Sequence, residues 1–256
     1  MTGVTTPLAA ALAGVFGAVL GSFLNVVAYR LPRGESLSTP RSRCPGCERP
    51  IRPYDNVPVL SWLLLRGRCR HCGERISSRY PLVELGTAAL LVLLVALEGV
   101  DRELWLGAVF VLLLVPIALI DLDHRIIPNR LTLWGSVAAL GILAVIDPGR
   151  LPEHLIAGVA AGGFLLVAAL AYPGGMGIGD VKLAAMMGLF LGRAVAPAML
   201  VALVAGTLVG AVVMARKGVT EGRKTAVPFG PFLALGALAG LFAGDAIVDW
   251  YLDTFV

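Results

Sequence analysis

The chain has 256 residues, of which 57% are hydrophobic and 15% are charged, and its net charge is +4. Soluble domains have about 45–50% apolar and about 25% charged residues. The composition therefore excludes an ordinary soluble domain and indicates a protein with several membrane-spanning helices. The charged residues lie in loops, where they set orientation, so the positive balance does not indicate nucleic-acid binding.

The apolar segments predict an all-α polytopic membrane protein with about eight transmembrane helices, since each crossing needs about 20 apolar residues. The sixth predicted helix is short and could merge with the seventh. We expect three parts: a first transmembrane helix at 1–29, a polar lobe at 30–80 and a transmembrane domain at 81–256. The predicted helices cover residues 8–29, 81–97, 104–120, 131–146, 154–172, 181–192, 197–215 and 230–248.

The basic residues predict the orientation in the membrane. Eighteen of the 21 Lys and Arg residues lie in alternate loops, at 30–80, 121–130, 173–182 and 216–229. By the positive-inside rule these loops face the cytoplasm, which leaves the N-terminus outside. No Lys or Arg precedes the first apolar segment, so we expect a permanent helix there and not a cleavable signal.

The polar lobe contains all four cysteines of the chain, in the pairs Cys44-Pro-Gly-Cys47 and Cys69-Arg-His-Cys72. Two CxxC pairs at this spacing are typical of a structural zinc site, in which four thiolates form a tetrahedron. Two disulfides or a redox-active pair are the alternatives. Disulfides rarely persist in the cytosol, where the charge pattern places this lobe, so we expect Zn²⁺ bound by Cys44, Cys47, Cys69 and Cys72.

Three acidic residues lie where apolar segments end on the predicted cytoplasmic side. Asp121 and Asp123 follow the third predicted helix, and Asp180 precedes the sixth. A carboxylate at a helix C-terminus is disfavoured by the helix dipole, and ionisable groups at membrane depth usually mark function. We therefore expect Asp121 and Asp180 to meet.

Such a group of acids allows several functions. Two close carboxyl groups could form an aspartic dyad, in which one holds a proton and the other activates water. A cation pathway in a transporter is an alternative, and so is a divalent-metal site that also uses Asp123 and His124. Asp180 could also be only a helix cap. Spacing alone does not choose among these.

The motifs resemble those of the prepilin peptidases, also called type IV leader peptidases. The resemblance rests on Asp121-x6-Pro128-Asn129 and Gly177-Ile-Gly179-Asp180-Val-Lys182, on the two CxxC pairs, and on the segments at 21–32 and 79–84. It implies an intramembrane aspartyl endopeptidase of the bacterial inner membrane. Such enzymes remove the basic leader of prepilin and pseudopilin precursors, after a glycine at the cytoplasmic face. It makes Asp121 and Asp180 catalytic, with accessory roles for Asp123, Lys182, Gly177 and Gly179.

The intact CxxC pairs resemble the bifunctional members of that family, which also methylate the new N-terminal residue. This implies S-adenosyl-L-methionine as the methyl donor. Glu84, with the arginines of the lobe, is our candidate for binding this cofactor or a substrate carboxylate; a plain ion pair with an arginine is the alternative. A peptidase without methyltransferase activity, or a cation transporter with a zinc-stabilised lobe, remains the rival function. The sequence leaves the oligomeric state open.

Overall fold

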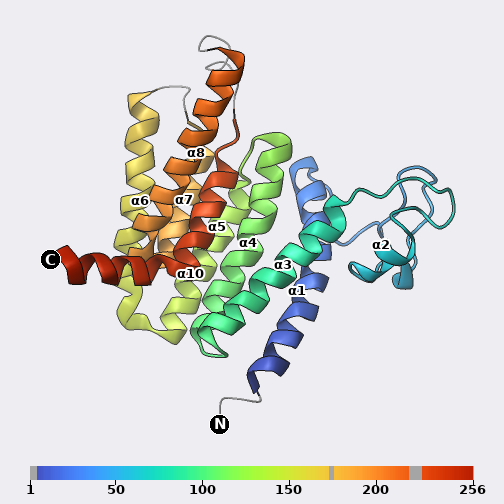
Figure 1. Ribbon diagram of the computed structural model, residues 1–256, viewed down its shortest axis with the longest axis horizontal. Helices are drawn as coiled ribbons and strands as arrows, with labels where there is room; N and C mark the ends of the chain where they lie inside the picture. The colour runs from blue at the N-terminus through green and yellow to red at the C-terminus, as the bar shows by residue number, and fades with distance from the viewer. Residues whose placement is uncertain (1–4, 173–175, 219–226, 256) are drawn as a thin grey trace. The chain divides into compact units, whose positions relative to one another are not determined.

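The computed structural model describes residues 5–172, 176–218 and 227–255, and within them it contains eight long helices and no β-strand (Figure 1). The long helices are α1 (Thr5–Arg30), α3 (Arg79–Glu98), α4 (Glu103–His124), α5 (Asn129–Ile146), α6 (Leu151–Ala171), α7 (Ile178–Leu191), α8 (Val195–Lys217) and α10 (Gly230–Phe255). The short elements are α2 (Leu60–Leu64) and the 3₁₀ helices η1 (Leu31–Arg33), η2 (Pro53–Asp55), η3 (Pro148–Arg150) and η4 (Gly192–Ala194).

The predicted all-α membrane fold is confirmed. Seven stretches of the described residues are long and apolar enough to cross a membrane, and one of them, Ile178–Lys217, contains both α7 and α8. Several helix ends differ from those predicted; the last helix, expected to end at 248, continues to Phe255, and two differences concern the acids. α4 continues to His124, so Asp121 and Asp123 lie in its last turn, and α7 begins at Ile178, so Asp180 lies in its first turn. Helical hydrogen bonding continues past the apolar residues that defined the predicted ends.

The chain divides into two compact units, residues 1–104 and residues 105–256. In the first unit α1 packs against α3. A Cβ atom added at Gly17 would lie 2.6 Å from the Cα atom of Ala88, and one at Gly21 would lie 2.8 Å from the Cα atom of Glu84. Membrane helices approach this closely where one of them carries small residues. The pairing is antiparallel, because higher numbers on α1 meet lower numbers on α3.

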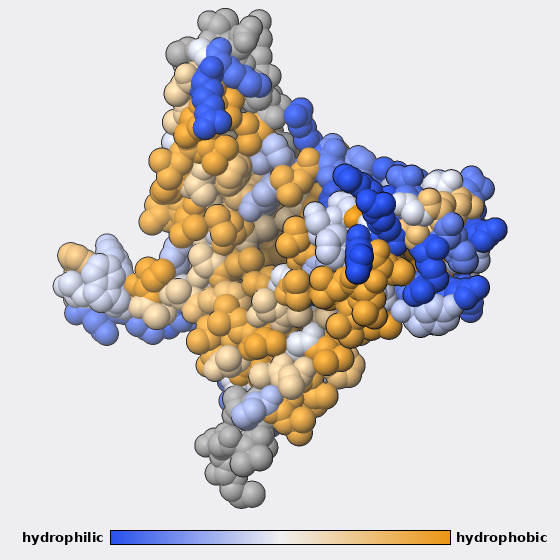
Figure 2. Space-filling view, turned by 45° about the vertical axis from the view of Figure 1, so that its right-hand side comes forward, coloured by the Kyte–Doolittle hydropathy of each residue, from blue (hydrophilic) through white to orange (hydrophobic). Residues whose placement is uncertain are grey.

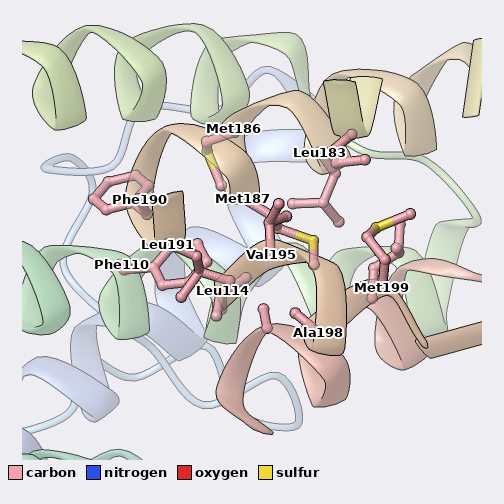
Figure 3. Packing of buried hydrophobic residues seen from close by; sticks show 14 of the residues in the cluster. Phe110, Leu114, Leu183, Met186, Met187, Phe190, Leu191, Val195, Ala198 and Met199 are labelled. Carbon is pink, nitrogen blue, oxygen red and sulfur yellow. The ribbon is translucent and has the colours of Figure 1, made fainter. Parts of the chain in front are cut away.

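In the second unit α7 is the central helix. It packs against α5, α6 and α10, and its side chains Leu183, Met186 and Met187 are fully buried (Figure 3). Its 14 residues span about 21 Å, less than the roughly 30 Å of a bilayer's hydrocarbon core. A helix this short and this buried is surrounded by protein and not by lipid.

Small residues also mediate the other close contacts of the second unit. On α6, a Cβ atom added at Gly162 would lie 2.9 Å from the Cβ atom of Ala185 on α7. On α10, Cβ atoms added at Gly240 and Gly244 would lie 2.7 and 2.6 Å from the Cβ atoms of Ala198 and Ala194. The helices of this unit therefore approach closely at glycine and alanine, while larger side chains fill the core between these contacts.

This packing predicts opposite results for two adjacent glycines on α6. Gly162→Ala should lower the free energy of unfolding by about 1–3 kcal/mol, because its methyl group overpacks the contact with Ala185. Gly163→Ala is the matched control, since a Cβ atom there meets nothing within 4 Å; it should be neutral, or stabilising by up to about 1 kcal/mol. Thermal unfolding in one detergent measures both. Equal effects of the two substitutions would contradict the close approach of α6 to α7.

Candidate active site and metal centre

One side-chain contact joins α4 directly to α7, and Gly135 of α5 lies beside both helices at a second level. The rings of Phe110 and Phe190 stack, with centroids 4.6 Å apart (Figure 3). One turn further along, a Cβ atom added at Gly135 of α5 would lie 2.9 Å from the Cδ1 atom of Leu113 and 2.5 Å from the sulfur atom of Met186. From one level to the next, the residue numbers increase on α4 and decrease on α7, so the two helices are antiparallel.

This register places the two conspicuous acids at the same level of the helix pair. Asp121 lies eleven residues beyond Phe110, and Asp180 lies ten residues before Phe190, which corresponds to about 16 and 15 Å along the two helices. The register therefore brings the last turn of α4 and the first turn of α7 to the same level.

Asp121 is held by the beginning of α10. Its side chain is 5% exposed, and its Oδ2 atom accepts a hydrogen bond of 2.9 Å from the backbone N–H of Gly230. The first N–H groups of a helix have no partner within the helix and bind anions well. A Cβ atom at position 230 would lie 2.7 Å from the same oxygen, so this approach requires glycine.

Sequence reasoning missed Gly230, which lies 109 residues from Asp121 along the chain. A local signal was present. Gly230 is followed by Pro231 at the start of the last apolar segment, and proline is common in the first turn of a helix. That signal indicates a helix N-terminus, but it does not indicate which carboxylate the N-terminus binds.

Asp180 is held by its own helix. It is partly exposed, and its Oδ2 atom accepts a hydrogen bond of 3.1 Å from the backbone N–H of Gly177, the residue that precedes α7. This is the reciprocal half of a capping box. The capping role considered from the sequence is therefore present, and the partial exposure also gives water access to this carboxyl group.

The connection between α4 and α5 is attached to the start of α7 by two contacts. A Cβ atom added at Gly179 would lie 3.0 Å from the Cβ atom of Ile127. The Nζ atom of Lys182 donates a hydrogen bond of 2.8 Å to the Oδ1 atom of Asn129, the first residue of α5. Gly179 and Lys182 thus hold together the helix ends that carry the two acids.

The remaining polar residues of this region are more exposed. Asp123 and His124 are both exposed in the last turn of α4. In the part of the chain that the structure describes, the four cysteines are the only group of three or more Cys, His, Asp or Glu residues placed to hold a metal ion. The geometry therefore does not support a metal site built from Asp121, Asp123, His124 and Asp180.

The four cysteines lie together in the cysteine lobe, residues 30–80. All four sulfur atoms lie within 4.8 Å of one another, and all four cysteines are free. The Sγ atoms of Cys44 and Cys72 are 3.7 Å apart, and those of Cys47 and Cys69 are 4.0 Å apart. A tetrahedral zinc ion with Zn–S bonds of about 2.3 Å needs sulfur atoms about 3.8 Å apart. The donor set therefore fits Zn²⁺, which would supply structural cross-linking and no reaction step.

The thiols differ in acidity. The pKa of Cys69 is lowered to about 6, chiefly because the backbone N–H groups of Cys72 and His71 donate to its sulfur. The N–H of Glu74 lowers the pKa of Cys72, but desolvation and the neighbouring thiols outweigh it and raise that pKa to about 12. Without a cation the cluster thus resists carrying four charges, so a bound Zn²⁺ would hold all four thiolates.

The lobe contains two equivalent knuckles, one around each CxxC pair and offset by 25 residues. In each, the N–H of the first cysteine donates to the carbonyl five residues later, from Cys44 to Arg49 and from Cys69 to Glu74. The flanking residues of each knuckle also form an isolated β-bridge, Arg43 with Pro50 and Arg68 with Arg75. Each knuckle contributes one cysteine pair, so the metal would join two copies of one hairpin.

Glu84, the candidate for cofactor binding, has a structural environment. It is 6% exposed on α3, and its Oε2 atom accepts a hydrogen bond of 2.7 Å from the backbone N–H of Val59, just before α2. Its role in binding a cofactor stays a prediction. Its burial and its partner favour a role in attaching the cysteine lobe to α3.

Comparison with known proteins places both sites in peptidase domains. Residues 15–98 match the model of the Bacterial Peptidase A24 N-terminal domain, and residues 108–215 match that of the Type IV leader peptidase family. The first match contains the four cysteines, and the second contains Asp121 and Asp180. These matches and the all-α fold define a membrane-embedded member of a peptidase class. No solved structure matches the chain significantly.

Curated relatives that carry the name prepilin leader peptidase/N-methyltransferase define the family more closely. The relative from Bacillus subtilis is 35% identical over 93% of this chain and 96% of its own length. The relative from Aeromonas salmonicida strain A449 is 36% identical over 94% and 93%. The one from Myxococcus xanthus is 42% identical over 83% of this chain, which spans 65% of that relative. The chain belongs to the type IV leader peptidase family.

The cysteine cluster yields a prediction about metal content. The purified protein should contain one zinc ion per chain, and Cys44→Ser should lose it and lower the unfolding temperature, since the ion links the two knuckles. His71→Ala should keep the zinc. Elemental analysis and thermal unfolding measure both effects. Zinc retained after loss of two cysteines from different knuckles would contradict a four-thiolate site.

Proposed function

We propose that the chain is an intramembrane aspartyl endopeptidase that cleaves type IV prepilin-like precursors, with Asp121 and Asp180 as its catalytic pair. The observation that supports this proposal is the register of α4 and α7, which brings the two acids to one level within the residues that match the leader peptidase family. We propose that cleavage follows a glycine and releases the basic leader of prepilin and pseudopilin precursors.

The surroundings of the two acids suit this chemistry. In an aspartic dyad, one carboxyl group takes a proton from the attacking water while the protonated partner donates a hydrogen bond to the scissile carbonyl oxygen. The partly exposed Asp180 has access to water. Asp121 is buried and held by Gly230. Proton transfer to the amide nitrogen then accompanies breakage of the C–N bond and regenerates the pair.

The site is proposed to lie at the cytoplasmic face of the inner membrane, with the N-terminus outside. This orientation rests on the distribution of Lys and Arg among the loops. A basic leader would stay on the same side for the same reason, with its apolar helix in the bilayer. The scissile bond would then lie at the level of the two acids, so hydrolysis would need water only at that face.

The rival functions fit less well. A transporter or a purely structural subunit does not account for the match to two peptidase domains. A metal-dependent hydrolase would need ligands around Asp121 and Asp180, and among the described residues only the cysteines form such a group.

The accessory roles proposed for Gly177, Gly179 and Lys182 are to position Asp180 and to hold the helix ends together.

Cleavage of a purified prepilin in detergent tests the dyad. Asp121→Asn and Asp180→Asn should each lower the turnover rate by at least about a hundredfold, because each removes one half of the acid–base pair. Asp123→Asn should keep a measurable rate. The matched control is Asp253→Asn, an exposed acid near the end of α10, which should cleave like the unaltered protein. Cleavage by both dyad variants at the normal rate would contradict the proposed catalytic pair.

The same assay tests the positioning of Asp121. Gly230→Ala should lower the turnover rate about tenfold with little change in KM, because its methyl group displaces the carboxyl group and not the substrate. Gly141→Ala is the control, since a Cβ atom there meets nothing within 4 Å. An unchanged rate for Gly230→Ala would show that the contact with α10 does not matter for catalysis.

We also propose that the chain transfers a methyl group from S-adenosyl-L-methionine to the new N-terminal amine. The support is the name shared by the relatives, prepilin leader peptidase/N-methyltransferase, and the intact pair of cysteine knuckles. The contacts of Glu84 with α2 do not favour it as the cofactor ligand. The arginines of the lobe are the other candidates for this role.

Methylation is tested with S-adenosyl-L-methionine labelled in its methyl group. Incubation with a prepilin should place the label on the N-terminal residue of the cleaved product and not on the uncleaved precursor, because only cleavage frees that amine. Mass spectrometry of the mature peptide measures this. Correctly cleaved product without label would show that the chain is a peptidase without methyltransferase activity.

A further inference from the structure

We propose that α2 of the cysteine lobe lies in the membrane interface, with its leucine face against a leaflet that carries anionic headgroups. The inference needs only α1 and α3 to cross the membrane, and it is independent of the proposed peptidase and methyltransferase activities. It rests on the exposure of three leucines, on the level at which α2 is held, and on the charge of the lobe.

The first observation is the two-sided character of α2. Leu60, Leu63 and Leu64 are 59%, 57% and 82% exposed, and residues three and four apart share one face of a helix. The other face is attached to the lobe. The hydroxyl group of Ser61 donates to the carbonyl oxygen of Tyr54, and the indole N–H of Trp62 donates to that of Ile76.

The second observation is the position of α2 along the axis of the membrane-spanning helix α3. The backbone N–H of Val59, which directly precedes α2, donates to the Oε2 atom of Glu84. Glu84 lies five residues inside α3, which begins at Arg79, so it lies about 7.5 Å from that end of the helix. α3 has only 20 residues, about the 30 Å of the hydrocarbon core. The exposed leucines are therefore held beside the first turns of a membrane-spanning helix.

The third observation is the charge of the lobe. Residues 30–80 contain eleven arginines, no lysine and four acids. Two exposed arginines, Arg66 and Arg68, follow the leucines directly. In Figure 2 blue, hydrophilic residues gather over this lobe, while orange covers the helices. An apolar helix face next to basic residues is the pattern of segments that lie in the plane of an anionic membrane surface.

The occupant that best fits this face is lipid and not the proposed substrate. A prepilin leader is basic, so the arginines that follow α2 would repel it, whereas they attract phosphate headgroups. The chain also enters and leaves the lobe through two membrane helices, α1 and α3, which keep α2 near the bilayer at all times. A protein partner would have to displace lipid from this position.

The test uses the full-length protein with a photoreactive benzoylphenylalanine in place of Leu64. It is placed in nanodiscs of equal parts phosphatidylcholine and phosphatidylglycerol. Illumination should attach lipid, with phosphatidylglycerol over-represented roughly fivefold, and Arg66→Gln with Arg68→Gln should return the ratio to that of the bilayer. The probe at Glu74, an exposed acid on the second knuckle, is the control and should attach little lipid. Zinc content verifies that each variant is folded.

Three results would overturn the proposal. One is attachment to an added prepilin in place of lipid, which would make the leucine face a substrate surface. Another is equal lipid attachment from Leu64 and Glu74. The third is a zinc-containing protein labelled at Leu64 that attaches no lipid. Cleavage activity is not the readout, so the outcome does not depend on whether the proposed peptidase function is right.

Discussion

The close approach of helix backbones to α7 is the constraint on which the second unit depends. Glycine and alanine at the contacts with α6 leave no room for larger side chains. The stacking of Phe110 on Phe190 fixes the register of α4 along the axis of α7. Because each helix is rigid along its axis, a contact near one end of the helix pair determines which residues are at the same level near the other end. The level of Asp121 relative to Asp180 is therefore a property of packing about 15 Å away.

The sequence was most informative where function needs a local spacing. The two CxxC pairs predicted the cluster of four sulfur atoms, and the apolar segments predicted eight helices with a short sixth one. Asp121 and Asp180 stood out because acids are costly at the ends of apolar segments. These inferences succeed because the relevant physics, ligand spacing or transfer from water to lipid, acts on residues near one another in the chain.

The sequence was least informative where distant segments meet. Nothing near Asp121 indicates that the N–H of Gly230 binds it, and nothing near Glu84 indicates that the N–H of Val59 does. The CxxC pairs indicate two knuckles, but the hydrogen bonds and β-bridges that make the knuckles equivalent could not be predicted, because the two segments share few residues besides the cysteines. The predicted ends of α4 and α7 were displaced because the run of apolar side chains is shorter than the run of helical backbone hydrogen bonds.

The base of the cysteine lobe bears on how such a protein can change in evolution. α1 and α3 are joined below the lobe by the hydrogen bond from Asn25 to the carbonyl oxygen of Tyr80, so the hairpin closes without the lobe. The lobe is in this sense an insertion module. Its removal would take the N–H of Val59 away from Glu84, and a buried carboxylate that loses its partner costs about 1–3 kcal/mol. Loss of the lobe and replacement of the residue at position 84 should therefore occur together among homologues.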